Sequence, residues 1–95
     1  MKFIIENSKE NILSLVRRLG YVLRHGDKGE FNCIRSVGEM RYPRFHLFIE
    51  KNQDKFIFKL HLDQKKPSYA GSSAHSGEYE GKLVEEEAQR IKNVV

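Results

Sequence analysis

The chain has 95 residues, of which 39% are apolar and 32% are charged, and its formal net charge at pH 7 is +4. This length supports one hydrophobic core, so we expect residues 1–95 to form a single domain, and the composition excludes wholesale disorder. One cysteine, Cys33, excludes an intramolecular disulfide and favours a reducing compartment. No apolar stretch approaches the about 20 residues of a membrane-spanning helix, so we expect a cytoplasmic protein without a membrane partner.

The charge is unevenly distributed along the chain. Residues 41–66 carry seven basic and three acidic residues, whereas residues 78–95 carry three basic and five acidic residues. A basic middle beside an acidic end favours an anionic partner for one surface only. The alternative is an ordinarily charged, solvated surface.

The first predicted elements are a short strand over residues 2–5 and a helix over residues 9–19. Ser8 is a suitable N-cap for this helix, and Gly20 is a suitable residue to end it. Apolar residues recur along the helix with the spacing of one buried face: Ile12, Leu15, Val16 and Leu19.

Two further strands are predicted over residues 21–25 and 30–37, joined by a turn over residues 26–29. Cys33 lies in the middle of the second of these strands, where we expect a buried thiol with a structural role. A strand, a helix and a strand in succession also allow one parallel pair at the start of the fold.

The clearest pattern is a β-hairpin over residues 44–63 with a turn at residues 51–54. One face is apolar and is expected to be covered by the helices: Phe45, Leu47, Ile49, Phe56, Phe58, Leu60 and Leu62. The other face is mixed and mostly polar: Arg44, His46, Phe48, Ile57, Lys59, His61 and Asp63. The register that suits this turn places Phe48 opposite Ile57. It also places His46 opposite Lys59.

A long Gly/Ser-rich loop is predicted over residues 64–81, followed by a helix over residues 82–93 in which Glu86 and Arg90 are spaced for an ion pair. The predicted fold class is α+β. We expect a mostly antiparallel meander of four to five strands with two helices packed on one face, in the order β-α-β-β-β-β-α.

The polar face of the hairpin and the loop after it form the predicted ligand site. Cationic groups engage phosphates, and aromatic rings stack on unpaired bases. The favoured function is therefore a non-enzymatic binding module for an anionic ligand such as single-stranded nucleic acid. The predicted ligand-binding residues are Arg44, His46, Phe48, Lys59, His61, Lys65, Lys66 and Tyr69.

Two alternatives remain open on sequence grounds. The first is a protein-protein contact or a homodimer, because Phe48 and Ile57 would form an apolar patch on the polar face. The second is a metal-dependent hydrolase, because imidazoles and carboxylates are ligands for divalent metals. The predicted metal ligands are His61, Asp63, His75 and Glu78. No nucleophile motif is present, so we assign no catalytic residue and expect no cofactor unless it is that metal.

Overall fold

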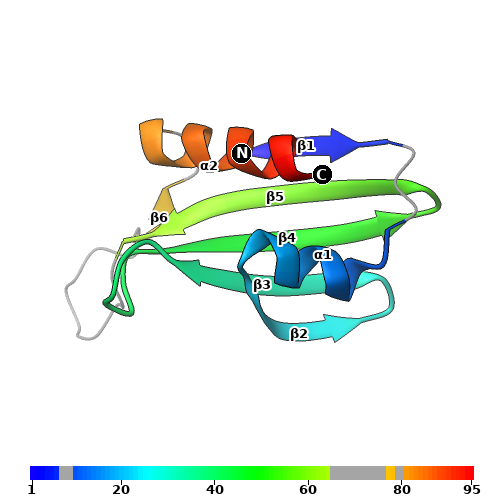
Figure 1. Ribbon diagram of the computed structural model, residues 1–95, viewed down its shortest axis with the longest axis horizontal. Helices are drawn as coiled ribbons and strands as arrows, with labels where there is room; N and C mark the ends of the chain where they lie inside the picture. The colour runs from blue at the N-terminus through cyan, green and yellow to red at the C-terminus, as the bar shows by residue number, and fades with distance from the viewer. Residues whose placement is uncertain (7–9, 65–76, 79–80) are drawn as a thin grey trace.

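A computed structural model describes residues 1–6, 10–64, 77–78 and 81–95 (Figure 1). These residues form one antiparallel sheet and two helices. The elements in chain order are β1 (Lys2–Ile5), α1 (Ile12–Leu19), β2 (Val22–Asp27), β3 (Glu30–Ser36), β4 (Arg44–Asn52), β5 (Lys55–Asp63), β6 (Gly77–Glu78) and α2 (Lys82–Val94). The α+β class and the antiparallel meander are confirmed. β6 is an addition, since its two residues lie inside the segment predicted as a loop.

The strands lie in the order β1-β5-β4-β3-β2, as Figure 1 shows from top to bottom. The sequence allowed a parallel pair between the first two strands, and this prediction is wrong. β1 pairs antiparallel with β5 and is far from β2. β1 lies beside residues 56–59 of β5, and β6 lies beside residues 62–63 on the same edge. The hairpin of β4 and β5 is therefore central to the sheet.

Both helices pack on the same face of the sheet, as predicted. Their buried residues and one face of the strands form a single hydrophobic cluster. Cys33 is fully buried in this cluster, which raises the pKa of its thiol to about 11 and keeps it protonated at neutral pH. Within the described ranges, neither helix has the length and apolar character needed to span a bilayer.

The first helix is shorter at its start than the sequence predicted. It begins at Ile12, and the side chain of Asn11 caps it by accepting a hydrogen bond of 3.2 Å from the backbone N–H of Ser14. The predicted cap, Ser8, lies outside the described residues. The predicted end is correct, since Gly20 adopts a left-handed conformation with φ of 86° and its N–H bonds to the carbonyl of Arg17.

The predicted register of the β4–β5 hairpin is wrong by two residues. His46 lies opposite His61, and Phe48 lies opposite Lys59. The reason is the turn, which contains only Gln53 and Asp54 rather than four residues, so the ladder gains two more pairs. A shift of two residues keeps every side chain on its predicted face, because the side-chain period of a strand is two. The faces were therefore predicted correctly while the partners were not.

The β2–β3 hairpin shows the same preference for a short turn. Its turn contains Lys28 and Gly29, with φ angles of 50° and 82°, and in the other hairpin Gln53 has a φ of 59°. Two-residue turns with positive φ match the right-handed twist of the flanking strands. In both hairpins the twist of the strands decides the turn length, and the polar composition of the segment does not.

Glu87 is a buried carboxylate that joins α2 to the rest of the fold. Its carboxylate accepts a hydrogen bond of 2.6 Å from the hydroxyl of Tyr21 and bonds of 2.8 and 2.9 Å from Arg90. Arg90 also donates to the carbonyl of Leu19 at 2.7 Å, which ties α2 to the end of α1. The predicted partner of Arg90, Glu86, is exposed on the helix surface, and the buried Glu87 takes its place.

The charge of Glu87 is retained despite its burial. Burial raises the pKa of this carboxyl, but the hydrogen bonds from Arg90 and Tyr21 and the positive charges of Arg90 and Arg35 outweigh burial and hold the pKa below its usual value of 4.5. Burial of the Tyr21 hydroxyl, and after it the hydrogen bond with Glu87, raise the pKa of Tyr21. Glu87 thus stabilises the fold in its ionised form and not in its protonated form.

We expect Glu87→Gln to lower the free energy of unfolding at pH 7 by about 2–3 kcal/mol, because charge-assisted hydrogen bonds become neutral ones. In the wild type this contribution is present above the unfolded pKa near 4.5 and is lost as the pH falls through the lower folded pKa. The free energy of unfolding, measured with denaturant between pH 7 and pH 3, should therefore depend less on pH in the variant than in the wild type. Glu86→Gln is the matched control, and an equal loss in that variant would contradict this role for Glu87.

Candidate functional site

One face of the sheet is left uncovered by the helices, and we call it the open face. The predicted ligand residues that the structure describes all project from it, in the central strands β4 and β5. The side chains of the open face come from all five long strands: Lys2, Ile4, Val22, His25, Asp27, Glu30, Asn32, Ile34, Ser36, Arg44, His46, Phe48, Glu50, Ile57, Lys59, His61 and Asp63.

Strand register aligns five of these residues in one line across the sheet. We call this line the cross-sheet row, and it consists of Lys2, Lys59, Phe48, Asn32 and His25. The ammonium of Lys59 lies 5.7 Å from the centroid of the Phe48 ring. The row thus passes from two cations through an aromatic ring to an amide and an imidazole.

Next to the row lies a compact group that we call the histidine cluster: His46, His61 and Asp63. Nδ1 of His46 lies 3.2 Å from Nε2 of His61, and that same Nε2 lies 3.0 Å from Oδ1 of Asp63. The two imidazole rings meet edge to face with centroids 4.6 Å apart. Nε2 of His61 is therefore the central atom of the cluster.

A neighbouring strand sets the tautomer of His46. Its Nε2 is hydrogen-bonded to the side-chain oxygen of Asn32 in β3. An oxygen acceptor requires a proton on Nε2, so in the neutral ring Nδ1 carries a lone pair directed at His61. Burial lowers the pKa of His46, and the charges of His61 and Arg44 lower it further against the opposing effect of Asp63. His46 is therefore neutral at pH 7.

Arg44 closes the other end of the histidine cluster. Its Nε lies 3.7 Å from Oδ2 of Asp63, and its guanidinium lies 4.5 Å from the centroid of the Tyr42 ring. The guanidinium thus lies on the Oδ2 side of the carboxylate without a hydrogen bond from Nε among the described residues, and Oδ1 is directed toward His61. Arg44 was predicted to bind ligand, and the structure places its guanidinium beside the carboxylate of Asp63.

The structure brings together only part of the predicted metal set. His61 and Asp63 are adjacent, and their third partner is His46, which belonged to the ligand set and not to the metal set. His75 lies outside the described residues. The backbone of Glu78 lies opposite Leu62 in the β5–β6 pair. The corrected register explains why His46 joins the cluster, because the residues directly opposite each other are the two histidines.

The predicted ligand set is also only partly placed. Lys65, Lys66 and Tyr69 lie outside the described residues. The open face adds Lys2, Asn32 and His25, which sequence analysis did not select. Lys2 comes from a strand whose partner in the sheet could not be read from the sequence. His25 and Asn32 come from the predicted hairpin of β2 and β3, but no local signal placed that hairpin beside β4.

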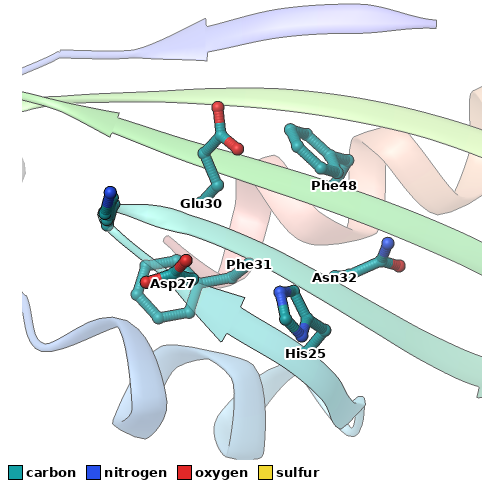
Figure 2. A pocket seen from close by; sticks show the side chains of 7 residues that line it. His25, Asp27, Glu30, Phe31, Asn32 and Phe48 are labelled. Atoms are coloured by element: carbon teal, nitrogen blue, oxygen red, sulfur yellow. The ribbon is translucent and has the colours of Figure 1, made fainter.

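A pocket of about 240 Å³ lies at the β2 end of the cross-sheet row (Figure 2). Figure 2 shows His25, Asn32 and Phe48 around it, each from a different strand. Asp27, Lys28, Glu30 and Phe31 complete the lining. The pocket is smaller than those that hold drug-sized molecules, and its lining combines one ring with several hydrogen-bonding groups.

The predicted apolar patch on this face is not formed as expected. Phe48 lies opposite Lys59 and Asn32, and Ile57 lies opposite Ile4 and Glu50. Phe48 and Ile57 are therefore diagonal neighbours, two ladder positions apart, instead of directly paired, and Ile57 lies beside the exposed Ile4. The predicted direct pairing is wrong, and the protein-protein contact stays a prediction.

We expect Asn32→Leu to weaken the tautomer preference of His46. In the wild type, side-chain ¹H–¹⁵N NMR should show His46 protonated at Nε2, and the variant should show a smaller fraction of this tautomer because the oxygen acceptor is gone and only the contact with His61 still favours it. Asn52→Leu, at the exposed end of β4, is the control. An unchanged His46 spectrum in Asn32→Leu would contradict the contact between the two side chains.

The chain matches no protein-family model, and searches of curated proteins and of solved structures also found no match. A function is therefore proposed from the residues of the open face alone.

Proposed function

We propose that this protein binds single-stranded nucleic acid on its open face and acts as a non-enzymatic binding module. The observation that carries the proposal is the cross-sheet row, in which Lys59 pairs with Lys2 and lies over the half-buried ring of Phe48. Cations for the phosphates and a ring for the bases are what binding of single strands requires.

The lysine end of the row favours an anion. Lys2 and Lys59 are exposed and lie directly opposite each other in the β1–β5 pair. Like charges directly opposite in a sheet destabilise the pair. Among the described residues neither lysine forms an ion pair, so a phosphate near both would relieve their repulsion.

The pocket end of the row supports recognition of one base. Phe48 offers a ring for stacking, and the amide of Asn32 and the imidazole of His25 offer hydrogen bonds to base edges. The carboxylates of Asp27 and Glu30 accept hydrogen bonds from base amino groups. A volume of about 240 Å³ is suited to a ligand part the size of a nucleobase.

Acidic residues at one end of the sheet determine how the bound nucleic acid lies across the open face. Asp27, Glu30 and Glu50 lie side by side on β2, β3 and β4, next to the cross-sheet row. Their charges repel phosphates, so the sugar-phosphate backbone should lie over β1 and β5. The base then points toward the pocket.

The test is fluorescence anisotropy of a labelled, mixed-sequence single strand at low salt. We expect Lys2→Gln combined with Lys59→Gln to weaken binding about tenfold and to reduce the slope of log affinity against log salt by about 1.4, or 0.7 for each phosphate contact. Phe48→Leu should weaken binding at least about fivefold, because stacking on an aromatic ring contributes about 1–3 kcal/mol per base.

Lys51→Gln is the charge-matched control, since Lys51 belongs to the side of β4 opposite to the open face. Polyphosphate is the second ligand, and its affinity should fall with the lysine variant and not with Phe48→Leu. The proposal is wrong if no binding occurs at low salt. It is equally wrong if Lys51→Gln weakens binding as much as the lysine pair does.

A further inference from the structure

The donor atoms of the histidine cluster have the spacing of a metal coordination sphere. Bonds of 2.0–2.1 Å in a tetrahedral site separate neighbouring ligand atoms by about 3.3 Å. In the cluster the two separations at His61 Nε2 are 3.2 and 3.0 Å. One donor atom from each residue lies within 4.8 Å of the other two, so a shift of at most about 1.5 Å completes the set.

The surroundings orient two of these donors. The oxygen of Asn32 holds the proton of His46 on Nε2, which directs the lone pair of Nδ1 into the cluster. The guanidinium of Arg44 lies 3.7 Å from Oδ2 of Asp63, and Oδ1 is the oxygen that faces the cluster. In metal sites the outer contacts of a ligating imidazole or carboxylate have the same role, since they select the tautomer and fix the orientation.

Without a metal, a proton holds the cluster together. Nε2 of His61 must carry this proton, because it faces two acceptors, Nδ1 of His46 and Oδ1 of Asp63. A divalent cation is able to occupy the same position and attract all three donors. Because the metal would bind the lone pair of Nε2, this atom would lose its proton, and the neutral bound ring would carry its proton on Nδ1.

We propose that the histidine cluster binds one divalent transition-metal ion of the zinc class through His46 Nδ1, His61 Nε2 and Asp63 Oδ1. Two imidazoles and one carboxylate suit zinc better than calcium or magnesium, which prefer oxygen ligands. Three protein ligands leave one position for water or an anion. This site is independent of the proposed nucleic-acid function, because it uses no residue of the cross-sheet row as a ligand.

Arg44 should oppose metal binding, in contrast to the three ligands. Its positive charge lies beside Asp63 and opposes the binding of a second cation. Removing that charge should therefore strengthen metal binding, whereas removing a ligand should weaken it. A variant that gains affinity cannot be explained by damage to the fold.

The test is calorimetric titration of Zn²⁺ into the full chain, purified without a polyhistidine tag and stripped with chelator, in the absence of nucleic acid. We expect one equivalent to bind. We expect His46→Gln, His61→Gln and Asp63→Asn each to weaken binding at least about tenfold, and Arg44→Gln to strengthen it. ¹⁵N NMR should show the Nε2 resonance of His61 losing its proton on titration with Zn²⁺.

His25→Gln is the matched control, because His25 is an exposed histidine of the open face outside the cluster. Circular dichroism of each variant confirms that it is folded. No binding of Zn²⁺ would overturn the proposal. Binding that survives both His46→Gln and His61→Gln would also overturn it, since it would place the ion elsewhere. Neither result bears on the anisotropy of the nucleic-acid complex.

Discussion

The antiparallel ladder between β4 and β5 is the constraint on which the rest of this structure depends. Its period of two separates a buried apolar face from an open polar one, and its two-residue turn decides which side chains meet across the strands. Because the turn is short, His46 meets His61 and Phe48 meets Lys59. A turn of four residues would keep the same faces but place neither of these pairs together.

Covering the sheet on one side only gives the two faces different roles. The helices seal the apolar face, and the bonds of Glu87 with Tyr21 and Arg90 link α2 to the end of α1. On the open face most side chains of the central strands are half-buried, with Lys59 exposed, so the hydrogen bonds of the half-buried groups are stronger than in water while these groups stay accessible. That combination suits a surface that binds charged or polar ligands.

The two proposals concern neighbouring parts of the open face and are linked by charge. Lys59 and His61 are separated by one residue on β5 and project to the same side, so the cross-sheet row borders the histidine cluster. A bound cation would offset the charge of Asp63 and make this part of the face more positive. Metal binding is therefore expected to favour an anionic ligand without being required for it.

Local pattern was sufficient to predict the α+β class, the apolar stripe of the first helix, the burial of Cys33 and the side of the sheet to which each hairpin residue belongs. These properties follow from periods of 2 and 3.6 that are visible within a few residues. Turn lengths, the pairing of β1 with β5 and the burial of Glu87 depend on strand twist and on contacts between distant segments, which no local pattern encodes. The sequence by itself thus determined which residues of the hairpin over residues 44–63 lie on the open face. Only the tertiary structure decided which of them are neighbours, and so joined His46 to His61 and Lys2 to Lys59.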